Sequence, residues 1–560
     1  MATLAPATPP EGPPASIRSG SAKQWTPEHY SASISTYAKQ RSTSLYVGVH
    51  FTRLAHILRK PFDGTAKRAP TYNYTPSSDF ATLYQYVFEK PVGYHALATP
   101  LELVQLAESE ASNVLFLRGQ PCPQWLVHAG ASFHIDPEFF FRHLDFLSNL
   151  SSKRYFAQPS LMSTARRIIQ LNYMTIGEFP AHSGDMGQSE LDHLRDSATR
   201  DMSEYFNELG KRVSRNACGS ESIVRAYHVL DQSHFAIEQQ ASICLGLTEK
   251  GWTAVVWLDT GRPLTPNQPG PWAGTLRSNQ HSGRETFLPW IQSQPFVSLH
   301  PASMSIAHER RPVKEMEQSA SLIHLDYGKT LDKKAMAQDP FYALHEVFLS
   351  CAYSEVQFLN VIESKINEDM AREFMPDHNI SPANMIYFQG LLDTHAESLR
   401  RTITAINSRD DSGWPRPSDQ TLRKKHAVLA HTLLQDYEAL LRRTETLSNL
   451  CKGRLQILLS RAGIVESNKA IEQAKVVTKL TRLAFVFIPL SFVSSFFGMN
   501  LKPFVESPPY GLWLFFAVSA PVVALLLMSM TLSLEQIMQP FGKCGRVRKP
   551  SKIVEKEDMA

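Results

Sequence analysis

Residues able to bind a cation through its hydration shell gather near the C-terminal end of this 560-residue chain. Ser491 and Ser495 are four residues apart, and Gly498, Met499 and Asn500 follow directly. Their hydroxyl, amide and backbone carbonyl oxygens accept hydrogen bonds without carrying a fixed charge. Because Mg²⁺ holds its water tightly, it is recognised largely through that water. The pattern therefore favours a site for a hydrated divalent cation.

Residue patterns typical of enzyme active sites are scarce in the rest of the sequence. His134-Ile135-Asp136 and His345-Glu346 lack a second ligand pair, which favours packed or surface histidines over a metal site. No glycine-rich phosphate loop follows a predicted strand, and no nucleophile stands beside a base. We therefore expect no enzyme and no bound cofactor. A formal net charge of +4 is small for this length and argues against nucleic-acid binding.

The polar residues near Asn500 lie within two apolar segments. Residues 483–497 are fifteen consecutive residues without a charge, and 511–534 are twenty-four more. About twenty apolar residues span a bilayer core of roughly 30 Å. The first segment reaches that length because it continues a long helix. We expect a hairpin of two transmembrane helices, 481–500 and 511–534, joined by an outer loop over 501–510.

Basic residues set the orientation of this hairpin. Lys475, Lys479 and Arg482 precede the first span, whereas Lys543 and Arg546 follow the second. Basic flanks stay on the cytoplasmic side of a membrane, so both termini are expected in the cytosol. The six cysteines are scattered without a CxxC pair, as is typical of reduced cytosolic thiols.

The rest of the chain reads as an α+β cytosolic domain followed by a long helical stalk. Residues 1–90 are rich in Pro, Ser and Thr, which predicts a disordered tail. Residues 95–335 form the α/β domain, 340–480 the helical stalk or funnel, and 535–560 a basic cytosolic tail. The predicted elements are strands at 114–117, 241–247 and 252–258, and helices at 136–147, 341–374, 383–407 and 418–500.

One face of the first span is a candidate pore lining. Leu480, Ala484, Ile488, Ser491 and Ser495 recur at helical spacing. Two spans cannot enclose an aqueous path, so a conducting protein needs several copies around one pore. Alternatively, the two serines are small residues at a helix–helix contact. Asn500 favours the pore, because it ends the span at the negative pole of the helix dipole.

Residues 476–501 resemble the first transmembrane helix of the CorA divalent-cation transporters. The matching residues are Leu480-Thr481, Pro489–Phe492 and Gly498–Asn500, in the same order. The resemblance implies a homopentamer in which Gly498, Met499 and Asn500 form the outer selectivity filter, with Asn500 binding the metal through water. It further implies that the candidate lining residues face the pore, with Leu480 at the inner constriction. RGQPCPQWL and DPEFFFRHLDF look like fungal members of the family.

Several features depart from that family. Its outer loop is usually acidic, whereas here Glu506 is the only carboxylate and Lys502 opposes it. The inner lining is also more apolar, which is compatible with gating by dewetting. Cytosolic sensor carboxylates cannot be placed by motif; the candidates are Glu355, Glu363, Glu368, Asp369 and Glu373, which are more often a solvated helix face.

The sequence thus favours an oligomeric channel for divalent cations, most readily Mg²⁺, embedded in the lipid bilayer of the plasma membrane. The mitochondrial inner membrane is the alternative location. Two other functions stay open: a non-conducting, membrane-anchored scaffold, and a CorA-like transporter of Zn²⁺. The number of subunits in the purified particle distinguishes the oligomeric channel from the non-conducting scaffold.

Overall fold

The structure is a computed structural model that describes residues 25–40, 48–62, 81–87, 92–107, 111–120, 122–146, 167–180, 187–214, 220–248, 251–282, 286–292, 318–325, 327–372, 382–409, 413–499 and 513–538. The chain divides into two units, Met1–Leu455 and Gln456–Ala560.

The first unit is built on a seven-stranded mixed sheet. Its strands are β1 (Ala81–Tyr86), β2 (Gly93–Leu97), β3 (Ser112–Arg118), β4 (Ile168–Glu178), β5 (Ala226–Val229), β6 (His234–Thr248) and β7 (Gly251–Leu258). The spatial order is β2-β1-β3-β7-β6-β4, and β5 pairs with β6. The β3–β7 pair is parallel and the other pairs are antiparallel.

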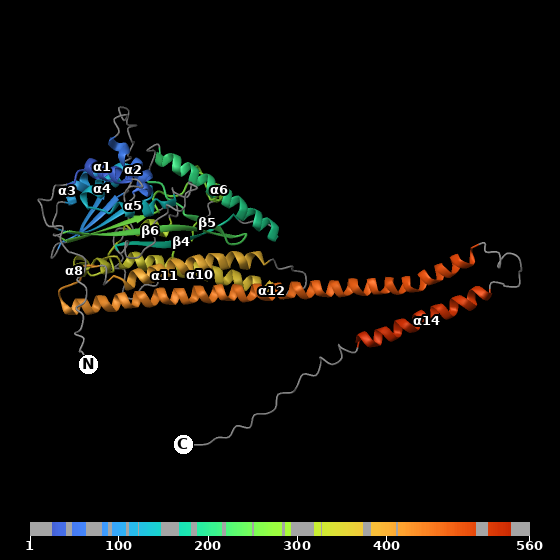
Figure 1. Ribbon diagram of the computed structural model, residues 1–560. Coiled ribbons are helices and arrows are strands. Elements are labelled where there is room, and N and C mark those ends of the chain that lie inside the picture. The colour runs from blue at the N-terminus through green and yellow to red at the C-terminus, as the bar shows by residue number, and fades with distance from the viewer. Residues whose placement is uncertain are drawn as a thin grey trace, which may run out of the picture. The chain divides into compact units, whose positions relative to one another are not determined.

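Helices cover both faces of this sheet, which gives three layers (Figure 1). One layer holds α1 (Pro27–Ala38), α2 (Thr52–Arg59), α3 (Pro100–Ala107), α4 (Pro123–Ser132), α5 (Pro137–His143) and α6 (Gln188–Ser214). The other holds α8 (Lys333–Gln338), α10 (His345–Arg372), α11 (Ala383–Asn407) and the first part of α12 (Gln420–Phe497). The remaining short helices are α7 (Ala273–Ser282), α9 (Pro340–Ala343), η1 (Val49–Phe51), η2 (Lys60–Phe62) and η9 (Ser319–Leu322).

Three helices begin with the same local device, a capping side chain followed by proline. Thr26, Asp136 and Asp339 each accept a hydrogen bond from a backbone N–H of the first turn. Proline then occupies the first helical position, where its missing N–H costs nothing. The prediction of a helix start at Asp136 is confirmed, although that helix ends at His143 rather than near residue 147.

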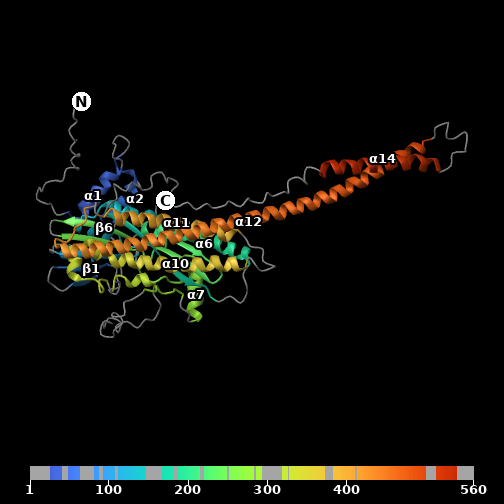
Figure 2. The same cartoon turned by 90° about the horizontal axis from the view of Figure 1, so that it is seen from below.

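The beginning of α12 belongs to the first unit and lies beside α10 and α11, packed along a regular face (Figure 2). Its buried side chains recur every three or four residues: Ala430, Leu433, Tyr437, Leu440, Thr444, Leu447 and Cys451. This spacing is that of a helix packed along its length. Gly453 and Gly463 lie within α12 and neither ends it. The helix bounds predicted for α11, Ala383–Asn407, are also confirmed.

The prediction of a disordered tail over residues 1–90 is wrong for the described part of that segment. Helices α1 and α2 and strand β1 lie there, and β1 pairs with both β2 and β3. Helix α1 is ordered because it buries Ile34 and Tyr30, whose hydroxyl donates to the Ile135 carbonyl at 2.7 Å. The sheet domain therefore begins earlier than residue 95.

A charged cluster is sealed inside the first unit. Asp259, fully buried, forms a double hydrogen bond with Arg225 at 2.7 and 2.9 Å. The His143 ring lies 3.1 Å from the same carboxylate and stacks on Trp257 at 3.8 Å between centroids. Burial lowers the pKa of His143 to about 4, although Asp259 opposes that effect. The cluster joins α5 to the end of β7, with His143 and Asp259 fully buried and the Arg225 side chain 14% exposed.

Candidate functional site

The second unit contains the apolar helices. Among the described residues, one helix, Gln420–Phe497, is long and apolar enough to cross a membrane. Only 6% of its most apolar window is buried. Helix α14 (Trp513–Met538) follows, and its described apolar part, Trp513–Leu525, is shorter. The large side chains exposed here include Leu480, Phe485, Ile488, Phe492 and Trp513. Apolar surface of this extent needs lipid or another protein to cover it.

The candidate lining residues occupy one narrow arc of α12. At 3.6 residues per turn, Leu480, Ala484, Ile488, Ser491 and Ser495 fall within about 80° of one another. All five are exposed, with Leu480 at 61% and Ile488 at 68%. The arc carries hydroxyl and aliphatic groups and no charge.

The opposite arc of the same helix is the covered one. Between residues 461 and 499, the side chains that are not fully exposed are Val486, Pro489, Leu490, Val493 and Phe497. These five lie about 180° to 280° around the helix from Leu480. The Phe497 ring meets the Phe515 ring of α14, with centroids 6.1 Å apart. We infer that α14 covers the face of α12 opposite the candidate lining.

Basic residues at the inner end of the apolar segment also avoid the candidate lining. Lys475, Lys479 and Arg482 are exposed and lie about 200° to 260° from Leu480. Their long side chains can reach lipid headgroups while their stems stay in apolar surroundings. The lining arc therefore stays free of positive charge, which would otherwise repel a cation.

The end of α12 lies at the predicted filter. The Gly498 amide donates to the Ser494 carbonyl at 3.0 Å, and the Met499 amide donates to the Phe496 carbonyl at 3.3 Å. Both Gly498 and Met499 are exposed. Asn500 and the loop residue Glu506 lie outside the described residues, so their predicted roles stay predictions.

The candidate sensor carboxylates have partners within their own chain. Glu355 on α10 is buried and lies 2.9 Å from His395 of α11. Glu363 pairs with Arg443, Glu368 with Lys365 at 3.0 Å, and Asp369 accepts from Asn384. Glu373 lies outside the described residues. Glu355 is therefore a buried structural group and not part of a solvated face.

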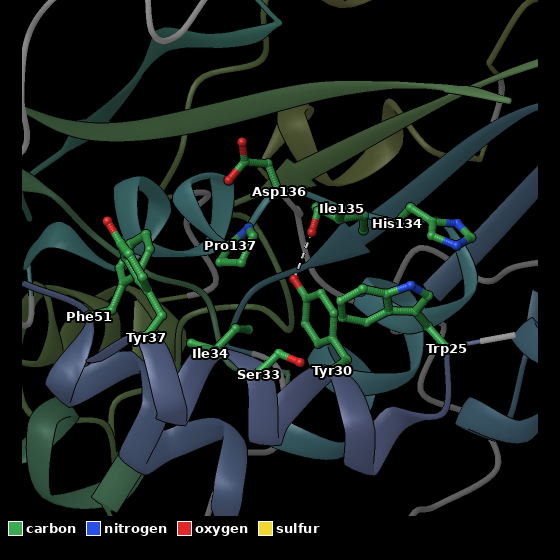
Figure 3. Close-up of a pocket in the computed structure, with 11 residues that line it drawn as sticks. Trp25, Tyr30, Ser33, Ile34, Tyr37, Phe51, His134, Ile135, Asp136 and Pro137 are labelled. Atoms are coloured by element: carbon green, nitrogen blue, oxygen red, sulfur yellow. Dashed lines mark hydrogen bonds between the residues drawn. The ribbon is translucent and has the colours of Figure 1, made fainter. Parts of the chain in front are cut away.

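His134 and Asp136 border an apolar pocket of about 420 Å³ between α1 and the segment before α5 (Figure 3). Their side chains point in different directions, which does not suit a shared metal ion. Asp136 caps α5, and Tyr30 is committed to the Ile135 carbonyl. Likewise, the carboxylate of Glu346 accepts from the amides of Gly328 and Thr330. The carboxylates of both motifs thus accept hydrogen bonds from backbone amides. Among the described residues, no group of three His, Cys, Asp or Glu side chains could hold a metal ion.

The sequence reasoning missed the residues that hold the two apolar helices together. Val493 and Ser519 are buried at 8% and 5% exposure, whereas almost everything around them is exposed. A signal existed, because Val486, Leu490, Val493 and Phe497 recur every three or four residues on the face opposite the serines.

Residues 384–531 match a family model described as CorA-like Mg2+ transporter protein. The matched range begins in α11 and extends through the whole of α12 into α14. Among solved structures, the chain is similar to the CorA magnesium transporter from Methanocaldococcus jannaschii, at 11% identity and a TM-score of 0.25. That likeness covers 64% of this chain and 96% of the other. No curated protein matches the chain.

Proposed function

We propose that this chain is one subunit of an oligomeric membrane channel for divalent cations, with Mg²⁺ as its principal ion. The match of residues 384–531 to CorA-like Mg2+ transporters supports the class of function. The observation that carries the proposal is the uncharged arc of α12, which lies opposite the face covered within its own chain.

An exposed arc of this kind calls for further copies of the same helix. Leu480 and Ile488 would be costly to leave in water, whereas Ser491 and Ser495 would be poorly placed in lipid. In a ring of helices each arc faces a common axis, where Ser491 and Ser495 would meet pore water and the apolar side chains of neighbouring copies would pack against one another at Leu480 and Ile488. We propose a homopentamer, as the resemblance to CorA implies, with α14 on the lipid side.

Ion selection belongs to the outer end of the ring. Each helix C-terminus there carries about −0.5 elementary charge, and Asn500 adds an amide oxygen. These oxygens accept hydrogen bonds from the water around Mg²⁺ without removing that water. Serine hydroxyls deeper in the pore continue the same hydrogen bonding. At the inner end, the Leu480 side chains form an apolar constriction that closes by dewetting.

The membrane potential supplies the driving force. Moving one charge across 100 mV releases about 2.3 kcal/mol, so a divalent ion gains about 4.6 kcal/mol. That is sufficient to hold an inward concentration ratio of about 10³ without any other energy source. An uncharged pore can therefore serve for uptake.

We also propose a hairpin topology in which α14 forms the second span. Its 26 residues would extend about 39 Å, longer than the bilayer core. Basic residues on both flanks place the N- and C-terminal segments on the cytosolic side. The plasma membrane is the preferred location and the mitochondrial inner membrane the alternative.

Mg²⁺ uptake by proteoliposomes tests the filter. We expect Asn500→Ala to lower uptake or its selectivity for Mg²⁺ over Ca²⁺ by at least tenfold. The matched control is Asn468→Ala, an exposed asparagine of α12 before the apolar segment, which should leave uptake unchanged. Equal flux in wild type and Asn500→Ala would refute the filter.

Native mass spectrometry of the purified particle tests the assembly. We expect five subunits. A monomer or dimer with no uptake would instead identify a membrane-anchored scaffold, and Zn²⁺ uptake without Mg²⁺ uptake would identify a zinc transporter.

A further inference from the structure

The pocket between α1 and the segment before α5, about 420 Å³ in volume, is lined largely by aromatic rings. Trp25 and Tyr30 lie at one end and Tyr37 and Phe51 at the other, with Ile34 between them (Figure 3). Tyr30 and Tyr37 are seven residues apart on α1, which is about 10.5 Å along the helix axis. The span between the two ends therefore suits a molecule made of one ring with a bulky substituent.

In each pair the two rings meet at an angle, so each end of the pocket is an aromatic corner. The rings of Trp25 and Tyr30 are 6.3 Å apart at 69°, and those of Tyr37 and Phe51 are 5.8 Å apart at 57°. Trp25 also stacks on His29 at 5.1 Å, which supports a ring that is 39% exposed. Aromatic walls set at an angle to one another are the arrangement that recognises quaternary ammonium groups.

The charge of the lining also favours a cation. Asp136 supplies a carboxylate, and among the described residues that line the pocket there is no lysine or arginine. This exposed side chain caps α5 through Oδ1, which accepts from the Glu138 amide. Its charge acts on the nearer aromatic corner, because burial raises the pKa of Tyr30 and the negative charge of Asp136 raises it further.

Two hydroxyl groups of the lining are unsuited to an anion. The Tyr30 hydroxyl donates to the Ile135 carbonyl at 2.7 Å, and the Ser33 hydroxyl donates to the His29 carbonyl at 2.9 Å. Their hydrogens are therefore already used within the protein. A neutral molecule would gain from apolar burial alone, whereas an organic cation would gain from the π faces and from the carboxylate as well.

We propose that this pocket binds a small organic cation, an aromatic molecule that carries a quaternary ammonium group. The ligand's ring lies in one aromatic corner, its ammonium group lies in the other, and Asp136 balances the charge from the rim. The site belongs to the first unit and does not rest on the transport function proposed for the second.

Calorimetric titration of the full-length protein in detergent tests the proposal, at about pH 8, where histidine side chains are ordinarily neutral. The two probes are 4-(trimethylammonio)benzyl alcohol and 4-tert-butylbenzyl alcohol, which share one shape and differ in charge. Heats of injection into protein-free detergent are subtracted. We expect the cation to bind about tenfold more tightly than its neutral counterpart. Equal affinities, or no binding of the cation at millimolar concentration, would overturn the proposal.

Substitutions in the lining separate the contributions of charge and ring. Asp136→Asn keeps an accepting oxygen for the helix cap, so the variant should fold normally and lose about threefold in affinity for the cation. Trp25→Leu keeps apolar bulk but removes a π face, and should also cost about threefold. Neither change should alter binding of the neutral probe by more than about 1.5-fold, since that probe has no charge to interact with either group.

The matched control is Glu28→Gln, which removes an exposed carboxylate of α1 that does not line the pocket. It should change affinity for the cation by less than about 1.5-fold, because solvent and salt screen an exposed charge outside the site. Equal losses in Asp136→Asn and Glu28→Gln would show diffuse attraction and overturn the site. Equal losses of both probes in Trp25→Leu would show apolar burial alone and overturn the cation assignment.

Discussion

The two units of this chain differ in which side chains they bury and which they leave exposed. The first encloses charged residues among apolar ones and gives them partners, as with Asp259, Arg225 and His143. The second leaves large apolar side chains exposed along α12 and covers one arc only. The first unit buries most of its large apolar side chains itself, whereas the exposed apolar surface of the second calls for lipid or another protein to cover it. Each difference can be tested by substitution.

Removal of the buried carboxylate should give the largest effect. Asp259→Ala leaves the largely buried Arg225 with the His143 carbonyl but without its carboxylate partner, which should cost up to about 3–5 kcal/mol. Chemical unfolding followed by tryptophan fluorescence measures this loss. The control is Glu397→Ala, whose carboxylate is 62% exposed and 3.6 Å from Arg400; it should cost less than about 1 kcal/mol. Similar losses in both variants would contradict the sealed character of the first unit.

A carboxylate placed on the covered arc of α12 should be far more disruptive than one placed on the candidate lining arc. Val493→Asp puts a carboxylate on the covered face and should cost about 2.5–3.5 kcal/mol per chain, seen as loss of the oligomer. Ser491→Asp puts it on the proposed water-filled side, where cation channels accept such rings. The oligomer should then persist in native mass spectrometry. Equal disruption by both variants would remove the distinction between the arcs.

Two buried histidines should give pH dependences of opposite sign. The pKa of His143 is lowered to about 4, so the folded state excludes a proton that the unfolded state binds. Stability is therefore full above pH 6.5 and falls by up to about 3 kcal/mol as the pH drops toward 4. Burial lowers the pKa of His395, but Glu355 and then Glu238 outweigh it and raise the pKa. Its contribution is present below pH 6.5 and disappears as the pH rises through the raised pKa.

Unfolding curves recorded from pH 4 to 9 measure both slopes. His143→Gln should reduce the dependence of the free energy of unfolding on pH at acidic pH, and His395→Gln should reduce it at alkaline pH. His431→Gln, an exposed control in α12, should alter neither. An unchanged acidic slope in His143→Gln would assign that slope to other groups.

The smallest effect concerns the helix caps of the first unit. Asp136→Ala removes the hydrogen bond to the Glu138 amide, 2.9 Å long, and should cost about 1 kcal/mol. Asp136→Asn keeps an accepting oxygen and should be almost neutral. A shift in Tm resolves the two. Equal Tm values for both variants would show that the cap contributes nothing.

Sequence reasoning succeeded where periodicity and boundary residues agreed. Helix α11 was predicted at its observed bounds because apolar spacing continues from Ala383 to Asn407 between a proline and a polar loop. It failed for α1, although Thr26-Pro27-Glu28 carries the same cap, proline and acidic residue as Asp136-Pro137-Glu138. Proline-rich composition before Trp25 concealed that signal. The tertiary contact that orders α1, from Tyr30 to Ile135, joins residues 105 positions apart and has no local pattern.

The candidate site was only partly accessible from sequence. The lining arc follows from spacing alone, because helical geometry fixes which residues share a face. Which arc is covered depends on α14, so the roles of Val493 and Phe497 required the structure. The pairing of Glu355 with His395 likewise joins two helices, and no spacing along either helix could predict it.

Pro489 lies inside α12 and Pro521 inside α14. Since proline has no amide hydrogen, the carbonyls of Phe485 and Ala517 lose their usual helical donors, and bending stiffness falls at those points. We expect the outer third of each span to flex as a hinged lever while the inner end holds still. In the proposed channel, the width of the pore would then change at Ser495 while Leu480 stays in place. Spin labels at Ser495 should report narrower distance distributions in Pro489→Ala, and unchanged distributions would exclude such a hinge.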